Sequence, residues 1–128
     1  MRTYHHLGIP TKEAKEGETY HANLKFSSTP FGANEFRIQW HRFDDDCEFN
    51  EIVKTIPHVA FKVDDLEAEI QDKIVVFGPY SPIKGFRAAM IITDDGFPIE
   101  FIETDLTDEK LIALEGKEAL NINNINIK

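Results

Sequence analysis

The sequence Gly96-Phe97-Pro98-Ile99-Glu100-Phe101-Ile102-Glu103 contains a pattern that also occurs earlier, in Phe36-Arg37-Ile38-Gln39-Trp40. In residues 36–40 and 97–101 alike, apolar side chains occupy the first, third and fifth positions. The fourth position holds a side chain with an oxygen donor, Gln39 in the first stretch and Glu100 in the second. Alternation with a period of two is typical of a half-buried strand. We therefore expect two strands that each present one oxygen ligand on the polar face.

A second repeat precedes each of these stretches. His6-Leu7-Gly8-Ile9 comes before the first, and His58-Val59-Ala60-Phe61 comes before the second. Internal repeats are a direct guide to architecture. The chain twice places a histidine strand ahead of a strand with a carboxamide or a carboxylate, and this order predicts a duplicated module that builds one shared site.

The composition favours a globular protein and excludes several partners. The 128-residue chain is long enough for one domain or for two half-size modules that share a core, and its hydrophobic content of 41% is too high for a disordered chain. The formal net charge of −9 argues against binding to nucleic acid or to an anionic membrane surface. The chain has no apolar run long enough to span a membrane and begins with no signal region, so we expect a cytoplasmic protein. The single cysteine, Cys47, follows three aspartates and is interpreted as a spectator.

The remaining elements are predicted from periodicity and from residues that end or cap them. Residues 11–17 have almost no apolar stripe and are expected to form a loop. Asp64 or Asp65 is expected to cap one short helix, and Thr107 another. The expected elements are strands at 3–9, 18–28, 35–43, 57–63, 74–77, 86–93 and 97–104, a link at 44–56, a loop at 78–82, helices at 64–71 and 107–120, and an extended tail or edge strand at 121–128.

Strand parity gathers four candidate metal ligands on one face of the predicted sheet: His6, Gln39, His58 and Glu100. Two imidazoles and two oxygen donors suit a divalent ion such as Mn, Fe, Co, Ni or Zn. Such a set leaves positions for water or substrate, which is typical of a catalytic rather than a structural site. His5 has the opposite parity on its strand, and it is predicted to be structural.

These residues resemble motifs of the vicinal oxygen chelate superfamily, which includes glyoxalase I, methylmalonyl-CoA epimerase, extradiol dioxygenases and the bleomycin- and fosfomycin-resistance proteins. Three stretches carry the resemblance: His-Leu-Gly-Ile at 6–9, His-Val-Ala-Phe-Lys-Val-Asp-Asp-Leu at 58–66, and Asp-Asp-Gly-Phe-Pro-Ile-Glu-Phe-Ile-Glu at 94–103. The resemblance covers most of residues 3–104 and is strongest in the second half.

The resemblance implies an α+β fold in which paired βαβββ modules form a curled mixed sheet around a cleft. The modules would span about residues 3–45 and 57–104 of a single glyoxalase-like domain at 1–128, with a C-terminal helix and tail at 105–128. The sequence between Pro10 and Glu18 offers no amphipathic helix, so the helix of the first module is expected to be reduced or missing. Relatives of this length often pair as homodimers, and we expect the same here.

The family's four metal ligands fall by position on His6, Gln39, His58 and Glu100. This order looks more like the epimerase branch of the superfamily than the dioxygenase branch, which uses two histidines and one glutamate. Glutamine is a weaker ligand than the glutamate that many relatives carry at the second position.

Three other residues share the predicted cleft face. His41 follows Gln39 by two positions, so it can replace Gln39 as a ligand or act as the catalytic base. Glu100 can be the catalytic base instead if it leaves the metal. Arg37 and Lys62 either bind an anionic substrate or face solvent at the rim of the cleft.

Two functions follow from the resemblance. The first is a metal-dependent glyoxalase-like enzyme, of isomerase or lyase type, that acts on a small oxygenated substrate through an enolate-like intermediate. The alternative is a non-catalytic small-molecule-binding protein of the bleomycin-resistance type, which the weak Gln39 ligand and the missing helix favour. In both cases the partner is a small molecule.

Overall fold

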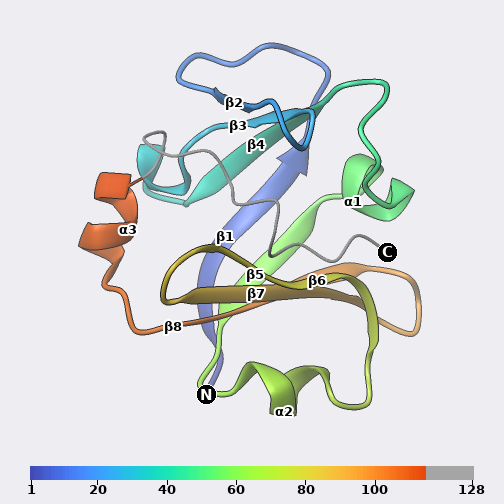
Figure 1. Cartoon of the computed structure of the whole chain (residues 1–128), viewed down its shortest axis with the longest axis vertical. Coiled ribbons are helices and arrows are strands. Elements are labelled where there is room, and N and C mark those ends of the chain that lie inside the picture. Colours follow the sequence, from blue (N-terminus) through green and yellow to red (C-terminus); the bar gives the residue numbers. More distant parts are fainter. Residues whose placement is uncertain (115–128) are drawn as a thin grey trace.

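The computed structural model describes residues 1–114, which form an eight-stranded mixed sheet with a few short helices (Figure 1). The order of strands across the sheet is β2-β3-β4-β1-β5-β8-β7-β6. The strands are β1 (Thr3–Pro10), β2 (Thr19–His21), β3 (Phe26–Ser28), β4 (Ile38–Phe43), β5 (His58–Lys62), β6 (Ile74–Ile83), β7 (Phe86–Ile92) and β8 (Pro98–Thr104). The predicted tail at 121–128 and the predicted helical residues after 114 lie outside the described residues.

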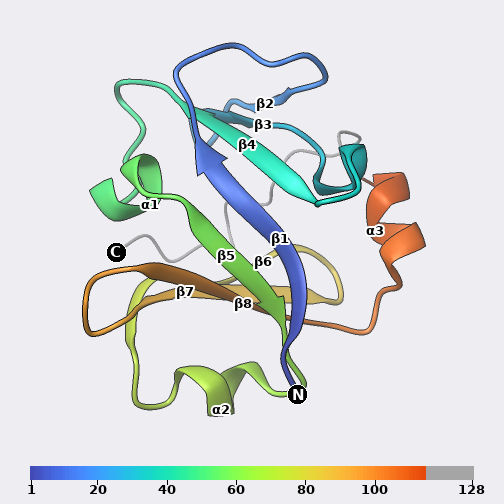
Figure 2. The ribbon, with the colours of Figure 1, turned by 180° about the vertical axis from the view of Figure 1, so that it is seen from behind.

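The sheet is strongly curled, and its centre is the antiparallel pair β1 and β5 (Figure 2). Each central strand also has a parallel neighbour, because β4 pairs with β1 and β8 pairs with β5. The outer strands complete each half as antiparallel pairs. Residues from both ends of the sheet, β2 and β6, line one pocket. The expectation of a curled mixed sheet in an α+β chain is therefore confirmed.

The helices are short: α1 (Glu51–Thr55), α2 (Leu66–Ile70), α3 (Asp108–Leu114) and a 3-10 turn, η1 (Phe31–Ala33). Asp65 caps α2 as predicted, because its side chain accepts the backbone N–H of Ala68. Helix α1 was not predicted; Asn50 caps it within the segment interpreted as a link. No helix among residues 1–114 has the length and apolar content needed to cross a membrane.

The two halves of the sheet are covered differently on the face away from the pocket. Leu66 and Ile70 of α2 pack with Ala89, Ile91 and Phe101 on the side of β7 and β8 that faces away from the pocket. The first half has no helix between β1 and β2, and residues 11–17 form a loop as predicted. That loop lies against β4, because Lys15 Nζ lies 4.4 Å from the Trp40 ring centroid and Glu18 pairs with Arg42.

A hairpin replaces the single strand predicted for residues 18–28. Residues 22–25 turn the chain between β2 and β3, and His21 pairs with Phe26 across the turn. Lys25 takes a φ of 61°, which the alternating pattern gave no reason to expect. The turn places His21 and Phe26 side by side at one end of the sheet.

The loop predicted at 78–82 belongs instead to β6, which runs without interruption from Ile74 to Ile83. Gly78 has a φ of 90°, and the pairing of β6 with β7 shifts register around it. Glycine tolerates this conformation where other residues do not. The irregular strand therefore keeps its pairing while Tyr80 reaches the pocket side of the sheet.

The close approach of β1 and β5 depends on a residue without a side chain. Gly8 pairs with His58, and a Cβ atom built on Gly8 would lie 2.2 Å from Cε1 of the His58 ring. Real Cβ atoms do not come this close to another heavy atom, so any larger residue at position 8 must displace the imidazole.

We predict that Gly8→Ala lowers the free energy of unfolding by about 1–3 kcal/mol, because one methyl group overpacks the site of the His58 ring. Urea unfolding measures the loss. In a His58→Ala background the same substitution should cost much less, since the ring is gone, and the double-mutant cycle isolates the contact. Equal costs in both backgrounds would contradict the steric explanation.

Candidate metal centre

Three of the predicted ligands meet on neighbouring strands. His6 lies on β1, His58 on β5 and Glu100 on β8, and β5 is the strand between the other two. Nε2 of His6 is 3.3 Å from Oε1 of Glu100, and Nε2 of His58 is 3.4 Å from the same oxygen. One ligand atom from each residue lies within 4.8 Å of the others, and all three side chains are buried. The three residues are therefore close enough to bind one metal ion.

Two small residues make room for these rings. His6, Ala60 and Glu100 stand in one row across three strands, because Ala60 pairs with both of the others. Ala60 is fully buried and adds only a methyl group between the two functional side chains. Gly8 does the same beside His58. A larger residue at either position would fill the space that the triad occupies.

The Glu100 carboxylate is ionised although it is buried. Burial by itself raises the pKa of this carboxyl, but hydrogen bonds from His58 and His6 outweigh it and hold the pKa well below its usual range. Tyr80 donates its hydroxyl to Oε2 at 3.2 Å. Burial, followed by the charge of Glu100, raises the pKa of the Tyr80 phenol well above its ordinary value, so the phenol remains a donor. Tyr80 therefore holds one carboxylate oxygen while the other faces the two imidazoles.

His5 also lies on the pocket side, which corrects the prediction made from its parity. The pairing of β1 with β5 shifts register between Tyr4 and His6, and an irregularity of this kind interrupts the alternation of faces. Nδ1 of His5 lies 2.8 Å from Nδ1 of His6, and both rings are buried. One ring must donate to the other, so the protonation of His5 fixes which nitrogen of His6 is free.

His41 lines the same pocket and stacks on His58, with ring centroids 5.6 Å apart. Both of its ring nitrogens are buried and have no hydrogen-bond partner among the described residues, although part of the residue is accessible. Burial, with the charges of His58 and His6, lowers the pKa of His41 well below 6.5. The ring is therefore neutral at physiological pH, and it can accept a proton or a hydrogen bond.

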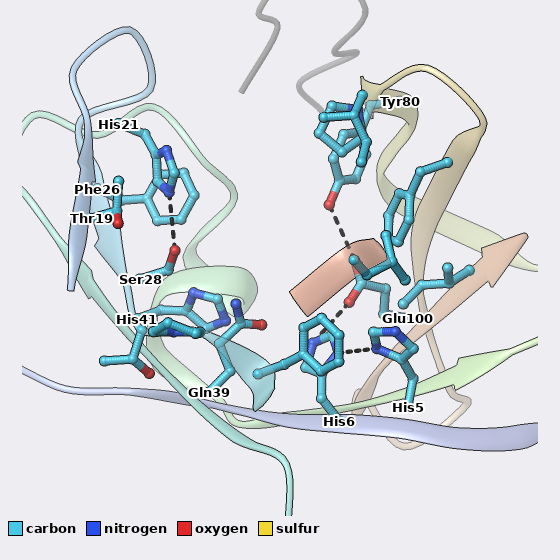
Figure 3. Close-up of a pocket in the computed structure, with 18 residues that line it drawn as sticks. His5, His6, Thr19, His21, Phe26, Ser28, Gln39, His41, Tyr80 and Glu100 are labelled. Carbon is cyan, nitrogen blue, oxygen red and sulfur yellow. Dashed lines mark hydrogen bonds and ion pairs between the residues drawn. The ribbon is translucent and has the colours of Figure 1, made fainter. Parts of the chain in front are cut away.

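The other predicted site residues lie farther from the triad. Gln39 lines the pocket and points towards it near His41 (Figure 3). Arg37 and Lys62 border a different surface depression instead of the pocket beside the triad. Arg37 precedes β4 with a φ of 58°, and it is engaged by the backbone oxygen of His5 and by Asp108, whose carboxylate is 3.1 Å away. Arg37 and Lys62 therefore do not line the pocket beside the triad, although the strand alternation predicts that they share its face.

The pocket beside the triad has a volume of about 200 Å³ and is lined by both ends of the sheet. A smaller cavity of about 70 Å³ shares His6, His41, Tyr80 and Glu100 with it. The chain has five histidines, and every one of them borders one of these two spaces. Such clustering of one polar residue type in a buried region is the strongest indication that this region is the functional site.

Sequence reasoning missed three residues of the site: His5, His21 and Tyr80. Alternation along the strand predicts the opposite face for His5, and Gly78-Pro79 predicts a loop around Tyr80. His21 lies in the unpredicted hairpin, where Nε2 is 3.0 Å from Oγ of Ser28. The sequence shows that there are five histidines, but their number alone does not predict that they lie around one site.

The chain matches no known protein-family model, and it matches no curated protein sequence at a significant level.

We predict that the protein loses stability on acidification, in part through His5. Burial, with the charge of His6, lowers the pKa of His5 from 6.5 to about 4. The unfolded chain therefore takes up a proton below pH 6.5 that the folded chain does not, so stability present above that pH is lost as the pH falls. Between about pH 7.5 and about pH 5 this residue alone should lower the free energy of unfolding by about 2 kcal/mol.

Urea unfolding at both pH values measures the loss, and His5→Phe is the comparison. The variant keeps a buried ring that cannot titrate, so its stability should fall by about 2 kcal/mol less over the same interval. The same pH dependence in both proteins would show that His5 is not held neutral in the folded state.

Proposed function

We propose that the protein is a metal-dependent enzyme of the vicinal oxygen chelate type, with isomerase or lyase chemistry on a small oxygenated substrate. The observation that carries the proposal is the buried set of His6, His58 and Glu100, placed within reach of one ion beside a pocket. Two imidazoles and a carboxylate form a donor set suited to Zn, Ni, Co, Mn or Fe.

The charge of the site supports the same proposal. Glu100 is ionised, and burial lowers the pKa of His6 despite the neighbouring carboxylate, so His6 is neutral at physiological pH. No lysine or arginine lines the pocket among the described residues. A buried carboxylate is costly unless an opposite charge compensates it, and a divalent cation held by the triad would supply that charge.

The arrangement of the strands supports the proposal that the protein is of the vicinal oxygen chelate type. We infer that residues 3–43 and 58–104 are two βαβββ modules, the first without its helix. Each half begins and ends with strands that pair in parallel, β1 with β4 and β5 with β8. The order in the first half, β2-β3-β4-β1, is mirrored by β5-β8-β7-β6 in the second.

His5 supports the ligand role of His6. Nε2 of His6 faces Glu100, while Nδ1 faces His5. For Nε2 to bind a cation, the proton of His6 must reside on Nδ1, where it is donated to Nδ1 of His5. Hydrogen bonds of this kind orient metal-binding histidines and fix their tautomer. Gln39, which lines the pocket, is the candidate for a further oxygen ligand.

The chemistry divides between the ligands and His41. A divalent cation would polarise an oxygen of the substrate, which acidifies the neighbouring C–H group. His41 is neutral, lines the pocket and has no competing partner among the described residues, so one of its ring nitrogens is assigned to receive the proton. Tyr80 holds Glu100 in place, and the apolar wall limits the access of water.

We predict that protein purified without chelator contains about one divalent cation per chain. Glu100→Gln and His58→Gln should weaken cation binding by more than the ten- to hundredfold that is typical of an outer partner, since each removes a direct ligand. Elemental analysis and competition with a chelating dye measure the occupancy and the affinity.

Glu103→Gln is the matched control. Glu103 lies on the same strand as Glu100 but accepts the backbone N–H of Leu66, so its replacement should leave cation binding unchanged. A wild-type protein that takes up no cation even after reconstitution, or a Glu100→Gln variant that binds as tightly as the wild type, would refute the metal centre.

A second candidate is a non-catalytic protein that binds small molecules. The predominantly apolar and aromatic wall of the pocket and the absence of a helix between β1 and β2 favour it. The two functions differ in one measurable respect: only the enzyme activates a C–H bond of its ligand.

We predict that the cation-loaded protein catalyses exchange of the C–H hydrogens next to the carbonyl of 2-hydroxyacetophenone with solvent deuterium. Proton NMR in deuterated water follows the exchange, and it does not require the enzyme's own substrate or product to be known. His41→Phe should retain the cation and slow the exchange by about 10²–10⁴-fold, which is the usual contribution of a general base. Binding of the ketone to loaded wild-type protein without any exchange would favour the binding protein over the enzyme.

A further inference from the structure

The pocket beside the triad has a polar end at Glu100 and an extended apolar wall. His6, Glu100 and Tyr80 lie at the polar end (Figure 3). The wall beyond them is formed by side chains from β3, the η1 turn, β6, β7 and β8, namely Phe26, Phe31, Pro82, Ile83, Phe86 and Ile102. A ligand with its oxygen atoms at the triad must therefore place the rest of its body against apolar surface.

The part of the pocket away from the triad has no fixed charge. Among the described lining residues, Glu100 is the one acidic side chain and none is lysine or arginine. Arg37, a nearby cation, stacks on Phe31 from outside the pocket lining and is paired with Asp108. A charged group on the distal part of a ligand would therefore be buried without a partner, and such burial is strongly unfavourable.

A second polar group lies at the far side of the pocket, on the hairpin of β2 and β3. His21 is only 7% exposed, and its Nε2 is held by Ser28. Its Nδ1 is buried and has no partner among the described residues. Thr19, two positions earlier on the same strand, also lines the pocket. Figure 3 shows His21 and Ser28 across the pocket from Tyr80 and Glu100.

We infer that this pocket selects a substrate with a single-ring apolar body, no charge at the end away from the triad, and one hydrogen-bonding group at that end for His21. The inference rests on the proposed function for the role of the triad, and it adds the class of molecule that the site takes. His21 takes no part in the proposed proton transfer. Its role would be to select the substrate.

The size of the pocket is consistent with one ring. An apolar cavity of about 150 Å³ holds benzene, and the pocket here has about 200 Å³. The difference accommodates a few substituent atoms on that ring. A buried donor or acceptor that stays unpaired is costly, so a distal hydroxyl that satisfies Nδ1 of His21 should improve binding.

Three probes that share one head group test the inference. They are 2-hydroxyacetophenone, its para-hydroxy derivative and its para-carboxy derivative, which differ only at the end away from the two adjacent oxygens. Calorimetric titration of cation-loaded wild-type protein should show the para-hydroxy probe binding about fivefold tighter than the parent. The para-carboxylate should bind about a hundredfold more weakly than the parent.

Variants of the hairpin connect these differences to named residues. His21→Phe should remove the advantage of the para-hydroxy probe over the parent. Thr19→Lys should recover about tenfold in binding of the para-carboxylate, because it supplies the missing cation. Thr19→Met is the matched control of similar length without charge, and it should recover nothing.

Repeating the titrations on chelator-treated protein separates the two proposals. The same order of the three probes without any bound cation supports the pocket inference even where the metal centre fails. A para-carboxylate that binds loaded wild-type protein as tightly as the parent overturns the inference, even where the cation is present in full. Failure of all three probes to bind the loaded protein overturns it as well.

Discussion

The burial of one carboxylate is the constraint on which the site depends. Removing an ionised group from water costs several kcal/mol unless the protein returns hydrogen bonds or charge. Glu100 receives a hydroxyl from Tyr80 on one oxygen and faces His6 and His58 with the other. Those three residues come from three strands, β6, β1 and β5. The carboxylate therefore obtains all of its partners only when the sheet curls and brings these strands together. The absence of a helix from the first half does not disturb the triad, because β1, β5 and β8, which carry His6, His58 and Glu100, are central or next to central in the sheet.

The triad could be predicted from sequence because its members lie on regular stretches of strand. Period-two alternation fixes the face of every residue in such a stretch, and His58 and Glu100 follow it. The apolar residues on the other side of the same strands made the polar face visible. The chain also repeats this pattern in both halves, so the two histidines and the glutamate could be aligned before their positions in space were known.

The residues that sequence reasoning misplaced lie where alternation fails. A register shift in β1 turns His5 into the pocket. Arg37 has a positive φ and immediately precedes β4, so the alternation of β4 does not fix the side on which Arg37 lies. Tyr80 follows Gly78-Pro79, a pair that is typical of a loop but here lies within a long irregular strand. His21 was hidden because the alternation of residues 18–28 continues through a turn without glycine or proline. These errors share one cause: the sequence carries the period of a strand, but it does not show where a strand becomes irregular or whether a strand continues through an irregular point.

The register shift in β1 affects how this kind of site can be recognised in other chains. Because it places two consecutive imidazoles on one side of the sheet, residue spacing along β1 is not conserved between a strand with the irregularity and one without it. A search template that is built on uninterrupted pleating and counted from Tyr4 would put His6 and every later position of β1 on the opposite face. A template for this architecture should therefore permit one inserted residue ahead of the small residue at position 8, and score the following positions from that glycine.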